Sequence, residues 1–184
     1  MNIEEKIIKL KNEKNAIILA HNYQIVPIQD LADFRGDSLQ LSIQAKKSQA
    51  PFIVFCGVRF MAETAAILNP EAKVILPVED AGCPLADMIN VEQLREFKAL
   101  HPEAKVVCYI NSSAAVKAES DVCCTSANAV QIINSFPEDE TILFVPDKNL
   151  GSWVAKKSGR KVIVWDGYCP VHQWGFTRRA YEHL

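Results

Sequence analysis

Short runs of apolar, often β-branched residues alternate with longer amphipathic stretches along this chain. The runs predict buried parallel strands, which are apolar on both faces, and the stretches predict helices, whose apolar positions recur about every three to four residues. The expected strands are residues 16–20, 52–57, 73–78, 105–110, 122–125, 141–146 and 161–165. The expected helices are residues 3–13, 28–34, 38–48, 60–69, 91–100, 113–119, 126–136 and 150–158. This alternation predicts an α/β fold built from βαβ units with short parallel sheets.

The same order of motifs occurs twice, at a repeat of about 87 residues. The stretch "GDSLQLSIQ" corresponds to "CTSANAVQI", which aligns two serines, and "KVILPVEDAGCP" corresponds to "KVIVWDGYCP", which aligns Cys83 with Cys169. Apolar strands can align by chance, but the coincident serines and Cys-Pro loops argue against that explanation. We therefore predict two pseudosymmetric αβα three-layer domains, residues 1–89 and 90–184.

Polar side chains follow the strands of both repeats, and parallel sheets bind their ligands beyond the carboxyl ends of the strands. His21 and Tyr23 follow the first strand, and Tyr109 and Asn111 follow its counterpart. Met61 comes after the next strand of the first repeat. If the two repeats face each other, these residues and the two Cys-Pro loops can line one cavity. We therefore expect the active site at the interface between the domains.

The composition indicates a globular protein, with 49% hydrophobic and 23% charged residues. A net charge of −2 argues against nucleic acid as a partner, because phosphate binding requires a basic surface. No apolar run approaches the roughly 20 residues that cross a bilayer, and the charged start "MNIEEKIIKLKNEKN" lacks the apolar core of a signal peptide. We expect a cytoplasmic protein that binds neither nucleic acid nor a membrane.

The six cysteines are expected to be free thiols or metal ligands, since disulfides are rare in cytoplasmic proteins. Four lie in strand-like runs and are interpreted as small buried hydrophobes, namely Cys56, Cys108, Cys123 and Cys124. Cys83 and Cys169 differ, because each lies in a loop after a strand, close behind a glycine and directly before a proline. Zinc fits poorly, since structural zinc sites use closely spaced ligand pairs. An iron–sulfur cluster fits better, because symmetry can bring separated thiolates together.

The aligned serines Ser38 and Ser126 each begin a predicted helix. A serine N-cap beside the free N–H groups of a helix start can bind a carboxylate or a phosphate, although a plain structural cap is the commoner case. Two matched caps suit a substrate with two anionic groups. His21 and Tyr23 are candidates for proton transfer, because imidazole titrates near neutral pH and a phenol can donate a proton.

Several motifs are informative when taken together: "AIILAHNYQ", "DLADFRGDSLQL", "FMAETAAILNP", "TSANAV", "PDKNLG" and "GYCPVHQ". In this order, and along essentially the whole chain, they resemble the quinolinate synthase family. The resemblance implies an enzyme of NAD biosynthesis that condenses iminoaspartate (iminosuccinate) with dihydroxyacetone phosphate to give quinolinate, releasing phosphate and two waters. It also implies three αβα domains with pseudo-threefold symmetry, each giving one cysteine to a 4Fe-4S cluster whose open iron acts as a Lewis acid. A separate enzyme would supply the iminoaspartate.

The resemblance further implies roles for individual residues. Cys83 and Cys169 would be cluster ligands, and His21 and Tyr23 would be catalytic. The residues that would contact the substrates are His21, Ser38, Met61, Tyr109, Ile110, Asn111 and Ser126. The third domain of the family, with the third cysteine, would fall beyond Leu184. We therefore expect this chain alone to lack synthase activity and to hold a cluster poorly.

Two other functions remain open from the residues alone. One is a cluster-free binding module in which two α/β lobes hold a small dianion, and such binding would survive replacement of Cys83 and Cys169 by alanine. The other is a hydrolase with Cys169 as nucleophile and His172 as base, although no orienting acid or oxyanion motif accompanies them.

Overall fold

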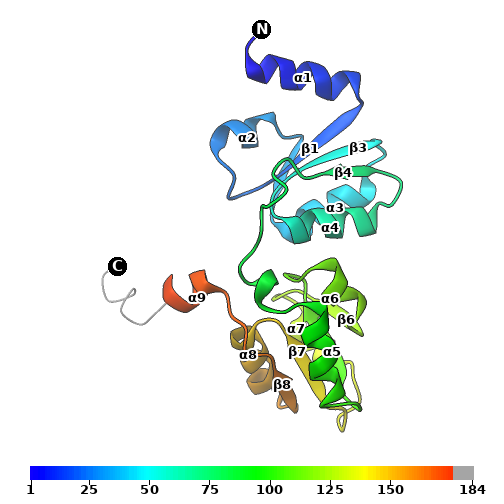
Figure 1. The fold of residues 1–184 in the computed structure, drawn as a ribbon, viewed down its shortest axis with the longest axis vertical. Helices are drawn as coiled ribbons and strands as arrows, with labels where there is room; N and C mark the ends of the chain where they lie inside the picture. The colour runs from blue at the N-terminus through cyan, green and yellow to red at the C-terminus, as the bar shows by residue number, and fades with distance from the viewer. Residues whose placement is uncertain (176–184) are drawn as a thin grey trace. The chain divides into compact units, whose positions relative to one another are not determined.

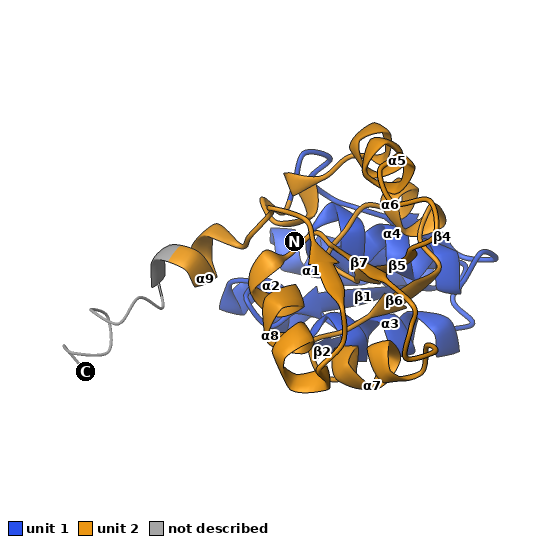
Figure 2. Ribbon diagram, turned by 90° about the horizontal axis from the view of Figure 1, so that it is seen from below, with its two compact units in different colours: residues 1–82 blue, residues 83–184 orange. Residues whose placement is uncertain are grey.

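The computed structural model describes residues 1–175, and residues 176–184, at the end of the second predicted domain, lie outside the described residues. The chain forms two compact units, unit 1 (residues 1–82) and unit 2 (residues 83–184), which Figure 2 colours separately. Each unit contains a four-stranded parallel sheet with helices packed against it. This arrangement confirms the predicted α/β fold of repeated αβα layers.

Unit 1 has the strand order β2-β1-β3-β4. Its strands are β1 (Ala16–His21), β2 (Phe34–Gly36), β3 (Phe52–Cys56) and β4 (Lys73–Ile75). Its helices are α1 (Ile3–Glu13), α2 (Val26–Leu31), α3 (Ser38–Lys47) and α4 (Arg59–Leu68). Figure 1 shows α3 and α4 on one side of this sheet and α1 on the other. Leu19 and Phe55 from the two central strands are fully buried, as expected for a sheet covered on both faces.

Unit 2 repeats this order as β6-β5-β7-β8. Its strands are β5 (Lys105–Tyr109), β6 (Val122–Cys124), β7 (Ile142–Val145) and β8 (Val162–Val164). Its helices are η1 (Ala86–Met88), α5 (Val91–Ala99), α6 (Ala114–Ala118), α7 (Ala129–Asn134), α8 (Lys148–Ser158) and α9 (Pro170–Gly175). One face of the sheet packs against Leu94 of α5 and Val116 of α6, and the other packs against Ile133 of α7 and Val154 of α8.

A matched set of hydrogen bonds shows that the two units are structural repeats. In unit 1, the backbone N–H of Ile18 donates to the Asp33 carboxylate at 2.7 Å, and the N–H of Asp33 donates back to the Ile18 carbonyl at 2.9 Å. In unit 2, Val106 and Asp121 make the same two bonds at 2.8 and 3.0 Å. The strand register agrees, since His21 pairs with Gly36 as Tyr109 pairs with Cys124. His21 and Tyr109 therefore occupy equivalent positions at the ends of β1 and β5.

Replacing Asp121 by alanine is expected to lower the free energy of unfolding by about 1–2 kcal/mol, because the fully buried N–H of Val106 loses its carboxylate acceptor. Urea unfolding followed by circular dichroism measures this loss. Asp139→Ala is the matched control, since Asp139 is an exposed carboxylate of the same unit. Equal stability of the two variants would show that the repeated carboxylate contributes nothing.

The boundary between the units lies at 82/83, earlier than the expected domain boundary at 89/90. The reason is that residues 83–89, here called the Cys83 segment, pack against unit 2. The indole N–H of Trp165 donates to the Met88 carbonyl at 2.9 Å. Ile89 is 2% exposed and belongs to the core cluster of unit 2. Cys83 is therefore carried by the same unit as Cys169.

Three elements of the described structure were not expected from the sequence, namely β2, η1 and α9. Residues 34–36 were predicted as the end of a helix and its following loop, but they form an edge strand beside β1.

Among the described residues, no helix has both the length and the apolar character needed to span a membrane.

Candidate functional site

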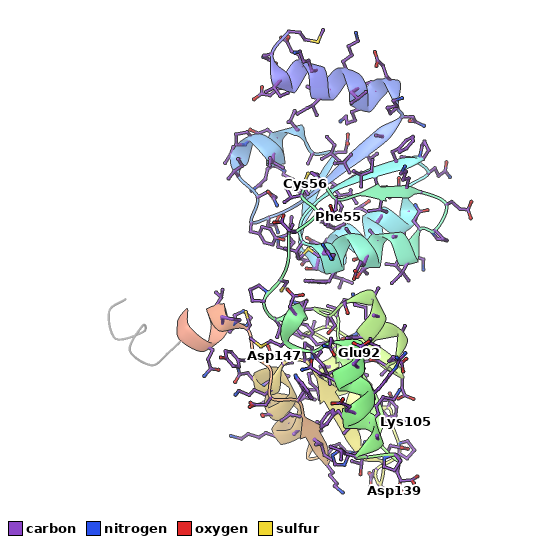
Figure 3. The ribbon with its side chains drawn as sticks, in the orientation of Figure 1. Phe55, Cys56, Glu92, Lys105, Asp139 and Asp147 are labelled. Carbon is purple, nitrogen blue, oxygen red and sulfur yellow. The ribbon has the colours of Figure 1, made fainter. Side chains whose placement is uncertain are left out.

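Tyr109, at the carboxyl end of β5, is the centre of the candidate site in unit 2. Burial is the largest of several effects that together raise the pKa of Tyr109 to about 12, and the others come from the ionisable groups of Asp147, Cys124, Cys169 and Cys83. Because such interactions weaken with distance, both Cys-Pro thiols and the Asp147 carboxylate must lie at the Tyr109 end of the sheet. Figure 3 shows Asp147 at one end of unit 2 and Asp139 at the opposite end. Tyr109 is thus a protonated phenol at neutral pH, suited to donating a hydrogen bond.

Asp147 is a buried carboxylate, 3% exposed, two residues after the end of β7. Its Oδ1 accepts hydrogen bonds from the backbone N–H groups of Asn149 at 2.8 Å and Leu150 at 3.1 Å. It is therefore the N-cap of α8, and these bonds offset the cost of burying its charge. Asp147 also forms an isolated parallel bridge with Gly167, which brings β7 beside the loop that carries Cys169.

Lys148, the residue after Asp147, holds residues 166–169, here called the Cys169 loop. The backbone N–H of Lys148 donates to the Gly167 carbonyl at 2.7 Å. Its ammonium group forms an ion pair with Asp166 at 2.7 Å and lies 4.9 Å from the centre of the Tyr168 ring. Lys148 thus contacts the loop on both sides of Gly167 through three different interactions.

The helix after the loop is tied to the same strand end. The side-chain amide of Asn149 donates to Gln173 of α9 at 3.1 Å, and the N–H of Gln173 donates to the Cys169 carbonyl at 2.9 Å. Cys169 therefore lies between two anchored stretches, which restricts where its thiol can point.

Gly167 brings the two cysteine-bearing stretches together. A Cβ atom at this position would lie 2.3 Å from the Pro146 carbonyl oxygen, 3.0 Å from Met88 Cβ and 3.0 Å from Trp165 Cδ1. The backbone therefore passes so close to Pro146 and the Cys83 segment that a side chain cannot be accommodated. This close packing and the hydrogen bond from Trp165 to Met88 hold the Cys83 segment beside the Cys169 loop.

His21 and Tyr23 form a separate pair at the end of β1 in unit 1. Their ring centroids are 4.0 Å apart with the planes tilted by 38°, and the Tyr23 N–H donates to His21 Nδ1 at 3.3 Å. Burial lowers the pKa of His21, although the Asp37 carboxylate acts in the opposite direction. A neutral imidazole that accepts at Nδ1 carries its proton on Nε2, so His21 presents an N–H donor. Tyr23 is 54% exposed.

The interpretation of the two aligned serines as helix N-caps was wrong. Asp37 is the N-cap of α3, where its carboxylate accepts from the Gln40 N–H at 2.8 Å, and Ser38 is the first residue of the helix. Asn128 is the N-cap residue of α7, two residues after Ser126. The Asn128 side chain instead accepts from the Thr125 N–H at 2.7 Å, which closes a turn before the helix begins. In both cases the N-cap position is taken by a nearby residue whose side chain carries a carboxylate or amide oxygen.

The other predicted substrate contacts are divided between the units. Ile110 donates its N–H to the Cys124 carbonyl at 2.9 Å, and Asn111 follows it, half-buried. Met61 lies in α4 and is 5% exposed, close to Gly57. The described residues contain no group of three or more His, Cys, Asp or Glu side chains that could hold a metal ion. Unit 2 therefore brings together Cys83, Tyr109 and Cys169, and unit 1 brings together His21 and Tyr23.

Comparison with known proteins identifies the family. A sequence model of the family described as "Quinolinate synthetase A protein" matches residues 5–183. The chain belongs to the quinolinate synthetase A family. Among relatives named quinolinate synthase, the protein of Dehalococcoides mccartyi strain CBDB1 is 61% identical over 92% of this chain and 56% of its own length.

Two further members of the quinolinate synthetase A family come from different organisms. The relative from Geobacter metallireducens is 58% identical over 93% of this chain, and the relative from Methanoregula boonei is 56% identical over 92%. In both cases the match covers 56% of the relative. The chain therefore spans about half the length of the curated relatives that it matches.

Proposed function

We propose that this chain is the part of a quinolinate synthase that comprises units 1 and 2. Quinolinate synthase is an enzyme of NAD biosynthesis. In the proposed reaction, iminoaspartate condenses with dihydroxyacetone phosphate to give quinolinate, with loss of phosphate and two waters. The observation that carries the proposal is the placement of Cys83 and Cys169 near Tyr109 in a member of the quinolinate synthetase A family. We expect the reaction to occur in the cytoplasm and a separate enzyme to supply iminoaspartate.

The two thiols fit part of the ligand set of an iron–sulfur cluster. Such clusters are held by cysteine thiolates, and Cys83 and Cys169 are free, partly exposed cysteines at the same end of one sheet. Residues 1–175 supply no complete metal-binding group, so a further ligand would have to come from elsewhere. We propose that Cys83 and Cys169 hold two corners of a 4Fe-4S cluster. When bound, the cluster supplies an open iron as Lewis acid.

The protein side chains of the proposed site bind and orient the substrates. Tyr109 stays protonated because its pKa is about 12, and its phenol can donate to a substrate oxygen. His21 is neutral because burial lowers its pKa, and its Nε2–H is a second donor. The other proposed substrate contacts are Ser38, Met61, Ile110, Asn111 and Ser126.

Tyr23 is proposed to transfer protons during the dehydration and isomerisation steps. The ring contact with His21 places its phenol beside a polar imidazole, and its exposure leaves it accessible to solvent. A phenol in that position can return a proton to the reaction from water.

The proposed function is tested by comparing the chain with an extended chain, in which the unmatched part of the Dehalococcoides mccartyi relative is joined to it. Under anaerobic conditions with iron, sulfide and both substrates, the extended chain is expected to form quinolinate, detected by mass spectrometry. The 184-residue chain alone is expected to form none, because its described residues lack a complete ligand set. The intact relative serves as the positive control.

Two outcomes would contradict this proposal. Quinolinate formation by the 184-residue chain alone would show that two units suffice. A folded extended chain that forms no quinolinate, beside an active intact relative, would show that this chain does not supply its half of the activity.

A further inference from the structure

Cys108 of β5 and Cys123 of β6 are direct neighbours across the sheet of unit 2. They are Cα partners in the parallel register, and both belong to the side of the core that contains Leu94 and Val116. Adjacent strands lie about 4.8 Å apart, which is within the roughly 4.4–6.8 Å between Cα atoms that a disulfide can bridge. The two thiols also interact with each other, and the Cys108 thiol donates a hydrogen bond to the Tyr109 carbonyl at 3.3 Å. The strand spacing therefore permits a bond between their sulfur atoms.

The two thiols have different surroundings. Cys108 is fully buried, whereas Cys123 is only partly buried and accessible to a small reagent. The contact with Cys108 lowers the pKa of Cys123, with help from the charge of Lys117 and against the effect of burial. The same contact raises the pKa of Cys108. Cys123 is therefore the nucleophile of the pair, and Cys108 is a thiol held against it.

We propose that Cys108 and Cys123 form an oxidation site at which a hydroperoxide closes an intrachain disulfide between β5 and β6. In the first step the Cys123 thiolate attacks the terminal peroxide oxygen and the O–O bond breaks as Cys123 becomes a sulfenic acid. The departing alkoxide or hydroxide takes a proton from solvent and leaves as an alcohol or water. In the second step the Cys108 sulfur attacks Cys123 Sγ and displaces the hydroxyl group. The Cys108 proton leaves with that hydroxyl group as water, so each disulfide consumes one peroxide.

The buried thiol is prepared for the second step by two hydroxyl groups. Ser112 and Ser120 lower the pKa of Cys108, which opposes the effects of Cys123 and of burial. Their hydroxyl groups donate to the backbone carbonyls of Tyr109 at 2.9 Å and Val116 at 2.8 Å. When Cys123 is oxidised, its thiolate charge no longer opposes ionisation of Cys108. The two serine hydroxyls can then turn from these carbonyls and donate to the Cys108 thiolate as it forms.

The site adjoins the candidate functional site without sharing its residues. The next residues along the paired strands are Tyr109 and Cys124, which are again Cα partners. A disulfide between Cys108 and Cys123 would link β5 to β6 one residue before Tyr109. The inference concerns thiol chemistry within unit 2, and it stands whether or not the protein makes quinolinate.

The test is to treat the 184-residue chain with hydrogen peroxide at neutral pH, alkylate the remaining thiols and digest with trypsin. Trypsin places Cys108 in the peptide 106–117 and Cys123 in the peptide 118–148. Mass spectrometry is expected to find these two peptides joined, and the joined form is expected to disappear after treatment with a reducing agent.

Matched variants identify which thiols react. Cys123→Ser is expected to reduce the joined peptides at least tenfold, whereas Cys124→Ser is expected to retain them, because Cys124 belongs to the other side of the core. Cys108→Ala provides a second loss variant, and thermal melting checks that each protein is folded. Joining through Cys124, or equal joining in folded Cys123→Ser protein, would overturn the proposal.

Discussion

Replacing Gly167 by alanine is expected to destabilise unit 2 by about 3 kcal/mol and to displace the Cys169 loop. The added Cβ would lie 2.3 Å from the Pro146 carbonyl oxygen, which is part of the backbone and cannot rotate away. The loop must move, and the bonds that Gly167 makes with Lys148 and Asp147 weaken with it. Urea unfolding, followed by tryptophan fluorescence, measures the change in unfolding free energy.

Gly159→Ala is the matched control for this steric effect. Gly159 ends α8 with φ of 70°, but no atom lies within 4 Å of a Cβ built there. Alanine at this position therefore costs only the strain of a left-handed backbone, about 1 kcal/mol. If Gly167→Ala were no less stable than Gly159→Ala, the close approach of the Cys169 loop to Pro146 would not matter in solution.

The central strands of both sheets could be predicted because they are buried on both faces. Strands β1, β3, β5 and β7 read as continuous apolar runs, which periodicity identifies directly. The edge strand β2 could not be predicted, because Phe34 and Arg35 are exposed and the segment carries no apolar run. It is a strand only because β1 provides hydrogen-bond partners for it. Its counterpart β6 has the apolar residues that β2 lacks.

The candidate site was only partly accessible from the sequence. The repeat and the loop positions singled out Cys83 and Cys169, and the structure places both near Tyr109. The residues that hold the Cys169 loop could not be found in the same way. Lys148 and Asp166 are separated along the chain by α8 and β8. Their ion pair therefore depends on how the Cys169 loop returns to the end of β7. A lysine and an aspartate at these positions read equally well as surface charges.

The two N-cap assignments failed as predictions for a local reason, although the expected helix start at Ser38 is the start of α3. Serine, aspartate and asparagine all cap helices, so a sequence with several of them in a row does not indicate which one is the cap. Asp37 takes the position beside Ser38 because its backbone N–H also donates to the Gln40 side chain at 3.0 Å, which completes a capping box. The roles of Ser38 and Ser126 in substrate binding remain predictions that no longer rest on capping.

Cys83→Ser and Cys169→Ser are each expected to reduce the iron retained by the anaerobically reconstituted extended chain at least tenfold. A serine hydroxyl ionises far less readily than a thiol and is a poor ligand for iron–sulfur iron. Cys56→Ser is the matched control, because Cys56 is also a partly buried cysteine at the carboxyl end of a strand, but it lies in unit 1 (Figure 3). This variant is expected to retain its iron.

The most direct measurement of the proposed function is therefore the ratio of iron and sulfide to protein in these three variants after removal of free iron. The proposal predicts full content in the parent and in Cys56→Ser, and loss in both Cys83→Ser and Cys169→Ser. Unchanged iron and sulfide in folded Cys83→Ser and Cys169→Ser proteins would contradict it.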